Sequence, residues 1–239
     1  MATLFVSDVH LSGARPDLVA LFLGFLAREA RVADALYILG DLFDLWVGDD
    51  DPDPLNRQVI AGLSALTGAG VPVFVMHGNR DFTLGARFAR ESGARLLPDP
   101  SVIDLYGTPT LLMHGDTLCT DDLQYQRARA RYRQPWVLAL SLALPRAVRV
   151  AIGRRLRAKS ERAKQTLAPE IMDVNAGAVE AAFRARSCTR LIHGHTHRPA
   201  RHEHQLAGQS CERWVLADWY RSGSYLRCDA AGCKAVALP

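Results

Sequence analysis

Residue types that bind metal ions recur in five short motifs along the 239-residue chain, and each motif follows an apolar run. The motifs supply aspartate, histidine and asparagine side chains, whose oxygen and nitrogen atoms coordinate divalent cations. They are Asp8-Val9-His10, Gly40-Asp41, Gly78-Asn79-Arg80-Asp81, Met113-His114-Gly115-Asp116 and Gly194-His195-Thr196-His197. Because these motifs are spread over most of the chain, they can form one site only if the fold gathers them.

The candidate ligands comprise two carboxylates, one amide and four imidazoles. They are Asp8, His10, Asp41, Asn79, His114, His195 and His197. A carboxylate has two oxygens, so Asp41 can bridge two cations. With a bridging water, each cation would have about five ligands, a mixed set that suits Mn²⁺, Fe²⁺ or Zn²⁺ better than Ca²⁺ or Mg²⁺. We expect two divalent cations, with Mn²⁺ as the first choice.

Two such ions, roughly 3.5–4 Å apart, would acidify a bridging water and stabilise an in-line displacement at phosphorus. Arg80 would add a guanidinium for a phosphate oxygen, which makes Asp41, Asn79, Arg80 and His114 the candidate catalytic residues. Asp81 and Asp116 are expected to orient ligands or loops. The chain has neither a phosphate-binding Gly-x-x-x-x-Gly-Lys loop nor a Gly-x-Ser-x-Gly elbow, which favours water as the nucleophile.

Buried strands are expected immediately before the motifs. Their predicted ranges are Thr3–Ser7, Ala35–Leu39, Val71–Met76, Thr110–Met113 and Arg190–Ile192. Helical patterns at 15–29 and 56–67 alternate with the first strands, as in βαβ units. The motifs would then lie at strand carboxyl ends, where open α/β sheets bind ligands. Two last strands, 214–217 and 225–228, are expected to complete a second sheet.

Composition is that of a globular protein, with 49% apolar residues. Met1-Ala2 leads directly into the first predicted strand without a signal-like segment, so a cytoplasmic protein is expected. The five cysteines include no Cys-x-x-Cys pair and are expected to be reduced. Asp49–Asp53 is interpreted as a solvated acidic turn, and His202 and His204 as part of a surface loop that binds no metal.

In this order, the five motifs resemble the signature of the calcineurin-like metallophosphoesterases. A lone Asp or His at a strand end is usually structural or solvated, but the complete ordered set argues against that interpretation. The resemblance implies an α/β fold, a four-layer αββα sandwich with a dinuclear site at one edge. We expect residues 1–118 and 173–239 to form this core, with 119–172 inserted as a helical cap.

The expected cap is strongly basic, because residues 120–164 hold 12 Lys and Arg against 3 Asp and Glu, a net charge of +9. Helices are predicted at 122–132, 136–144 and 146–164. The apolar run 136–144 is too short to span a bilayer. The third helix could pack its apolar face on the core, lie on anionic lipid, or form a cleft for acyl chains with basic residues for phosphate. Nucleic acid could bind the arginines, but the apolar run would have no use there.

Within the superfamily, the chain resembles a family of UDP-2,3-diacylglucosamine pyrophosphohydrolases of lipid A biosynthesis. The resemblance rests on Tyr37–Asp41, Met76–Phe82, Leu97–Pro100, Met113–Asp116 and Ile192–Pro199. It implies hydrolysis of UDP-2,3-diacylglucosamine to UMP and 2,3-diacylglucosamine 1-phosphate by water attack on the α-phosphorus. Its substrate-binding positions match Asn79, Arg80, Asp122, Ser160, Lys164 and His195. One further family lysine is replaced by Leu167.

This resemblance also implies peripheral association with the cytoplasmic face of the inner membrane, with no nucleic-acid partner and no obligate protein partner. Two alternatives stay open. One is a metallophosphoesterase that acts on a soluble nucleotide or a phosphoprotein. The other is a noncatalytic, metal-dependent membrane scaffold, which the complete ligand set disfavours.

Overall fold

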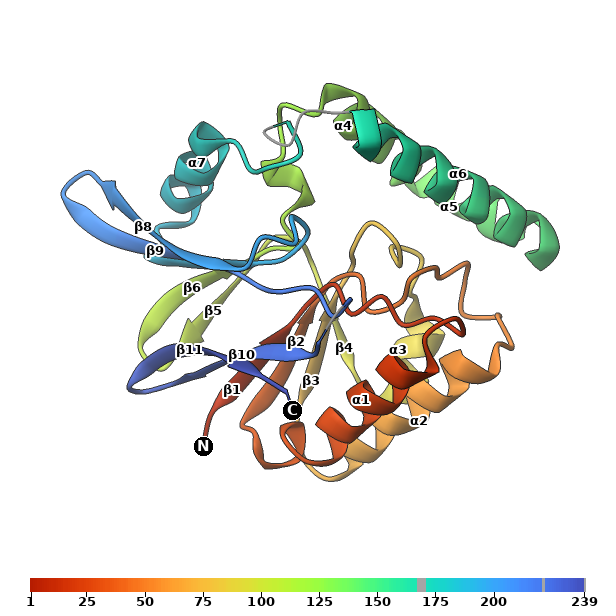
Figure 1. Ribbon diagram of the computed structural model, residues 1–239, viewed down its shortest axis with the longest axis horizontal. Coiled ribbons are helices and arrows are strands. Elements are labelled where there is room, and N and C mark those ends of the chain that lie inside the picture. The colour runs from red at the N-terminus through yellow and green to blue at the C-terminus, as the bar shows by residue number, and fades with distance from the viewer. Residues whose placement is uncertain (167–170, 221, 239) are drawn as a thin grey trace.

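The computed structural model describes residues 1–166, 171–220 and 222–238. Its core holds two β-sheets that lie face to face, with helices on both outer faces (Figure 1). The α/β sandwich implied by the family resemblance is confirmed.

The first sheet has six strands, and those that carry the first three motifs are parallel neighbours. In spatial order its strands are β11 (Gly232–Ala237), β10 (Ser224–Asp229), β1 (Thr3–Val6), β2 (Ala35–Leu39), β3 (Val73–Met76) and β4 (Arg95–Leu97). Its outer face is covered by α1 (Pro16–Ala27), α2 (Pro54–Gly68) and α3 (Ala86–Ser92), with the short η1 (Ala30–Val32) after α1. Helix α2 begins at Pro54 with Asp53 as its N-cap, an arrangement that satisfies its first backbone N–H groups.

The second sheet has five strands. In spatial order they are β5 (Ser101–Leu105), β6 (Thr108–Leu112), β7 (Arg190–His193), β9 (Gln209–Val215) and β8 (Ala200–Leu206). Strand β7 is parallel to both of its neighbours, so the ends of β6 and β7 carry the last two motifs to one edge. Helix α7 (Ala176–Arg186) covers the outer face of this sheet.

Side-chain alternation along the strands separates the four layers. In β1, Leu4 and Val6 pack toward the helices, whereas Phe5 belongs to the apolar cluster between the two sheets. In β6, Leu112 joins that central cluster and Leu111 packs toward α7. All five side chains are at most 3% exposed. Near-continuous burial on both faces explains why these strands read as apolar runs rather than as alternating sequences.

Three details differ from the sequence-based expectations. Two last strands were expected to complete the second sheet. The 214–217 prediction overlaps β9 of that sheet, but the 225–228 prediction corresponds to β10, which joins the first sheet beside β1. His202 and His204 lie in strand β8 rather than in a loop, because the alternate residues of this polar segment face α7. Cys228 and Cys233 form a disulfide, because the β10–β11 register places them directly opposite each other with Cα atoms 4.1 Å apart.

The inserted segment forms the cap helices α4 (Leu123–Tyr132), α5 (Pro135–Ala143) and α6 (Arg146–Thr166), which follow the short η2 (Asp116–Leu118). They lie beyond one edge of the two sheets, and α6 runs above the segment between β2 and α2 (Figure 1). Neither α4 nor α5 has a buried residue. In the described part of the chain, no helix is both long and apolar enough to cross a membrane.

Candidate metal centre

The predicted ligands follow the carboxyl ends of β1, β2, β3, β6 and β7, which meet at one edge of the two sheets. Backbone geometry there is unusual, since several ligands have positive φ angles. These are Asp8 (52°), His10 (54°), Asp41 (53°), His195 (70°) and His197 (55°). Non-glycine residues rarely adopt this left-handed conformation, which persists only where the surrounding structure fixes it. These strained backbone conformations point the ligand side chains toward one another.

Glycines beside the ligands permit the close approach. A Cβ atom on Gly78 would collide with the Asp41 carboxylate, and one on Gly40 would collide with the His114 ring. A Cβ on Gly194 would similarly meet the Asp8 carboxylate. These three motif glycines are thus needed for space, and Gly40 also has a φ of 89°.

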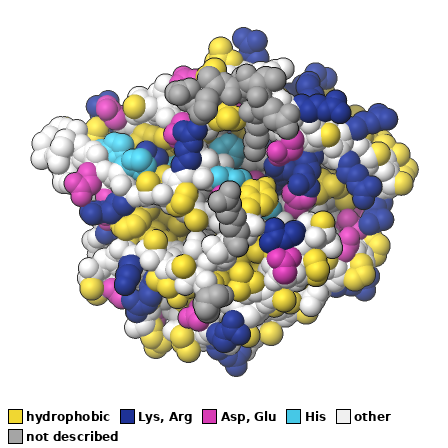
Figure 2. All heavy atoms as spheres, viewed as in Figure 1, with side chains coloured by type: hydrophobic (Ala, Val, Ile, Leu, Met, Phe, Trp, Pro, Cys, Tyr) yellow, Lys and Arg dark blue, Asp and Glu magenta, His cyan; other side chains and the backbone are white. Residues whose placement is uncertain are grey.

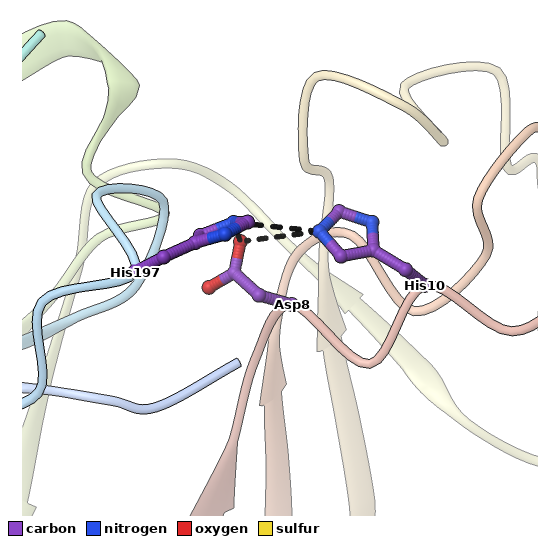
Figure 3. A group of neighbouring side chains, drawn as sticks. All are labelled: Asp8, His10 and His197. Carbon is purple, nitrogen blue, oxygen red and sulfur yellow. Dashed lines mark hydrogen bonds and ion pairs between the residues drawn. The ribbon is translucent and has the colours of Figure 1, made fainter. Parts of the chain in front are cut away.

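Asp8, His10 and His197 form the first group of converging side chains. Figure 3 shows Asp8 and His10 entering from the segment after β1, and His197 from the segment after β7. Asp8 Oδ1 lies 3.3 Å from His197 Nε2 and 3.9 Å from His10 Nε2, and the two imidazole nitrogens are 3.4 Å apart. One small cation could contact all three atoms.

Asp41, Asn79, His114 and His195 form a second group beside the first. Asn79 Oδ1 lies 3.2 Å from His114 Nε2 and 3.0 Å from His195 Nδ1. Asp41 connects the two groups, because its Oδ1 lies 4.0 Å from His114 Nε2 and its Oδ2 lies 3.9 Å from His10 Nε2. Asp8, Asp41 and His114 also place ligand atoms within 4.8 Å of one another. The structure therefore gathers all seven predicted ligands around two adjacent positions.

The electrostatics of this cluster fit bound cations. Burial raises the pKa of Asp41 to about 7. Burial acts against the charged form of His114, but the carboxylates of Asp41, Asp116 and Asp8 raise its pKa to about 9. Burial also opposes ionisation of Asp8, yet the imidazoles, His197 first, bring its pKa well below the usual range. Buried Asp8 Oδ1 faces the imidazole nitrogens of His197 and His10, so a cation that displaced the imidazole protons could bind it.

Residues around the ligands fix their orientation. His114 Nδ1 donates to Leu39 O at 2.9 Å, which turns Nε2 toward the site. Asp81 accepts from the backbone N–H groups of Gly78 and Leu42, both at 2.8 Å, and so ties the Asn79 loop to the Asp41 loop. The expected orienting role of Asp81 agrees with these contacts.

Asp116 has a different set of partners from the one expected. It is fully buried, and the side chains that donate hydrogen bonds to its carboxylate within the described residues lie on α4. Its Oδ2 instead accepts from Tyr125 Oη at 2.7 Å and from Arg129 Nε at 2.6 Å, both on α4. Asp116 therefore attaches the cap helices to the core beside His114.

Sequence reasoning missed two residues after β9. Asp218 Oδ2 lies 3.6 Å from His197 Nδ1, and the Tyr220 ring stacks on the His10 ring with centroids 5.2 Å apart. Between them, Trp219 is fully buried against Phe22 and Phe25. No motif precedes this segment, so only its closeness in space links it to the ligands.

The expected substrate-binding residues lie partly at the centre and partly on the cap helices. Arg80 is largely buried and donates from Nη2 to Glu161 Oε1 on α6 at 2.7 Å. Asp122 caps α4 by accepting from Tyr125 N at 2.9 Å, and Ser160 is exposed on α6. The Lys164 side chain and Leu167 lie outside the described residues. Of the expected substrate-binding residues, the structure places Asn79, Arg80 and His195 among the proposed metal ligands and places Asp122 and Ser160 on the cap helices.

Comparison with known proteins matches this architecture and site. The model of the calcineurin-like phosphoesterase family matches residues 1–199. The chain therefore belongs to the calcineurin-like phosphoesterases, as the motif order predicted. A solved archaeal phosphodiesterase covers all of both chains at 10% identity and a TM-score of 0.49, a likeness too weak to refine this assignment.

Full-length relatives define the family more narrowly. Proteins named UDP-2,3-diacylglucosamine hydrolase from Escherichia coli O7:K1 and from Salmonella arizonae are each 53% identical to the chain over 239 residues, covering 100% of both sequences. Within the phosphoesterases, the chain is thus a member of the UDP-2,3-diacylglucosamine hydrolase family. The expected family and its hydrolytic class are confirmed.

Proposed function

We propose that the protein hydrolyses the pyrophosphate bond of UDP-2,3-diacylglucosamine, giving UMP and 2,3-diacylglucosamine 1-phosphate in lipid A biosynthesis. The supporting observation is the position of Arg80. It lies beside the gathered metal ligands on one side and contacts α6 of the cap helices on the other. A substrate whose phosphates join a nucleoside to a lipid requires such a junction between a metal centre and a partly apolar region.

Two divalent cations, with Mn²⁺ as our first choice, would be held by the seven ligands and would supply activated water and charge stabilisation at phosphorus. Asp41 would bridge the two positions, because its two oxygens face His114 and His10 respectively. Asn79 and His195 would serve both as ligands and as contacts to the substrate phosphates. Arg80 would exchange its Glu161 partner for a phosphate oxygen and stabilise charge that develops in the transition state.

The segment 119–172 would act as the cap that binds the lipid half. Large apolar side chains on its helices are exposed, since Trp136 is 66% exposed, Leu140 62% and Ile152 42%. Lys and Arg side chains gather over the region of the cap helices, next to histidines at the centre of the same face (Figure 2). Asp122, Ser160 and Lys164 would bind the polar parts of the substrate there, beside the acyl chains.

The same exposed face supports peripheral association with the cytoplasmic side of the inner membrane. Apolar residues with surrounding arginines bind to anionic lipid surfaces through area burial and charge attraction. No nucleic-acid or obligate protein partner is needed for this function.

Isotope labelling tests the proposed reaction directly. The Mn²⁺-loaded protein would be given UDP-2,3-diacylglucosamine in ¹⁸O-water, beside a generic chromogenic phosphodiester. We expect ¹⁸O in UMP, because attack at the α-phosphorus puts the new oxygen there. Labelled sugar phosphate would place the attack at the β-phosphorus, and cleavage of the generic ester alone would reject the substrate.

A further inference from the structure

A cavity of about 250 Å³ lies outside the cap helices, on the part of the molecule that faces α7. It is bounded by the loop after β7, by the adjoining ends of β8 and β9, and by the segment before α7. Its lining residues are Asp173, Thr196, Arg198, Pro199, Ala200, His202, Arg213 and Val215. Thr196 stands between the ligands His195 and His197, so the cavity borders the metal centre within one residue of each.

The cavity wall carries the buried guanidinium of Arg213, whose charge is stabilised electrostatically by the lining carboxylate of Asp173. Arg213 is 7% exposed, and no salt bridge is found for it among the described residues. Its hydrogen bond runs from Nη1 to Nε2 of the neutral His193 at 3.1 Å, while its Nε has no partner in the described chain. His193 Nδ1 donates to Gly194 O at 2.9 Å, which leaves Nε2 of this ring as an acceptor for the guanidinium.

A second donor in the wall is also unused. Thr196 Oγ1 is buried and makes no hydrogen bond with the described residues. Buried polar groups without partners are costly, and they commonly mark a place that a ligand or water completes. The cavity therefore calls for a ligand rich in acceptor oxygens.

We propose that this cavity binds the uridine half of the substrate, while the cap helices bind the lipid half. This inference rests on the proposed function and divides the substrate across the metal centre. The volume is below the roughly 300–1,000 Å³ that encloses a whole drug-sized ligand, so it suits one pyrimidine and part of its ribose rather than two acyl chains. Uracil carbonyl and ribose oxygens would accept from Arg213 and Thr196.

Two variants test the site without touching a metal ligand. Thr196→Val removes the hydroxyl at nearly constant size, and Ala200→Leu fills the cavity from an exposed position. Ala230→Leu, in the exposed turn between β10 and β11, and Thr108→Val, at the start of β6, are the matched controls. Uridine and UMP would be titrated into each Mn²⁺-loaded protein by calorimetry, with the metal content measured in parallel.

We expect Ala200→Leu to weaken uridine and UMP binding by about tenfold or more, and Thr196→Val by about three- to tenfold, as for loss of one hydrogen bond. Both variants should retain metal and cleave a generic phosphodiester like the wild type. Uridine has no phosphate, so its binding cannot arise from the metal ions. Unchanged uridine and UMP affinity in both variants would overturn the inference.

The wild type separates this inference from the proposed function. If the wild type turns over UDP-2,3-diacylglucosamine but both variants bind uridine normally, only the uridine site is rejected. Absence of that turnover in the wild type would reject the proposed function itself. Loss of metal from Thr196→Val would show a structural role for the hydroxyl, which also contradicts a ligand-binding role.

Discussion

The metal centre and the cap helices differ in how far their side chains are buried. Four of the seven proposed ligands are buried, and glycines lie directly against Asp8, Asp41 and His114, which also bonds to the backbone of β2. The cap helices α4 and α5 bury no residue and leave large apolar side chains in solvent. Such exposure is unusual in a soluble surface unless it serves binding.

Ion pairs connect the cap helices to the core at several places. The pairs involve Arg129 with Asp116, Arg146 with Asp51, Arg149 with Asp50, Arg157 with Asp44, and Glu161 with Arg80. The acidic run 49–53 is therefore not merely a solvated turn, because two of its carboxylates bind α6 and Asp49 accepts the first backbone N–H groups of α3. The comparison teaches that buried contacts hold the core, whereas the cap helices are joined to it mainly through polar side chains, which suits the exchange of contacts that we propose for the substrate.

The largest expected effect comes from removing ligands of the proposed metal centre. Asp41→Ala and His114→Ala each delete a proposed metal ligand, and we expect turnover to fall by about a thousandfold or more together with loss of bound metal. Metal analysis and steady-state kinetics would check this. His204→Ala, a histidine on β8 outside the centre, is the control and should change neither quantity. Normal metal content in both ligand variants would contradict their assignments.

Arg80 lies at the boundary between the two regions, so its replacement should separate chemistry from metal binding. We expect Arg80→Ala to keep its metal but lose at least about tenfold in turnover, because one charge-stabilising donor is removed from the transition state. Arg87→Ala, which removes an exposed arginine of α3, should behave like the wild type. Loss of metal from Arg80→Ala would mean that the residue supports the ligand geometry instead.

The sequence predicted the metal centre better than it predicted the contacts of the cap helices. The carboxyl ends of parallel strands meet at one edge, which predicted that Asp8 lies near Asp41. His195 follows a strand of the other sheet, and its place beside them was predicted from the family resemblance. Asp218 and Tyr220 were missed, because they approach through a loop whose position depends on the buried Trp219. The disulfide was also missed, because the pairing of Cys228 with Cys233 depends on a hairpin register that cysteine spacing does not reveal.

The cap helices were predicted as helices, but their contacts with the core were not. Apolar periodicity in α6 was compatible with packing on the core, with binding to a lipid surface and with a cleft for acyl chains. The structure leaves Val148 and Ile152 each 42% exposed. Ion pairs between distant segments leave no periodic trace in a sequence. Asp116 illustrates this, since its buried carboxylate binds Arg129 of α4 although its motif suggested a partner for a ligand.

A smaller effect is expected from loosening the attachment at Asp116. Asp116→Asn removes the charge that holds Tyr125 and Arg129, which should destabilise this contact by about 2 kcal/mol, as for hydrogen bonds to charged groups. We expect faster proteolysis within the cap helices and a higher KM for the lipid substrate, with metal retained. Asp104→Asn, in the exposed β5–β6 turn, is the control. Loss of metal with an unchanged proteolysis pattern would instead tie Asp116 to the metal centre.

The smallest expected effect concerns Glu161, which occupies the Arg80 guanidinium that we assign to the substrate phosphate. Because Glu161 is 46% exposed, this pair contributes only the modest energy of a surface ion pair. Glu161→Gln should therefore lower the KM for the substrate by about two- to fivefold and leave kcat unchanged, since the phosphate no longer displaces a carboxylate. Added salt should reduce the ratio of the wild-type KM to the variant KM, because screening weakens the ion pair between Arg80 and Glu161 that competes with the phosphate.

Glu180→Gln on α7 is the matched control for this last change, because it removes a similarly exposed carboxylate that pairs with Arg184 away from the site. Its KM should equal that of the wild type. A rise in KM for Glu161→Gln would show that the carboxylate assists binding rather than competing with phosphate. In that case the contact between α6 and Arg80 would be part of the fixed geometry, and the boundary between the two regions would lie within the cap helices instead of at Arg80.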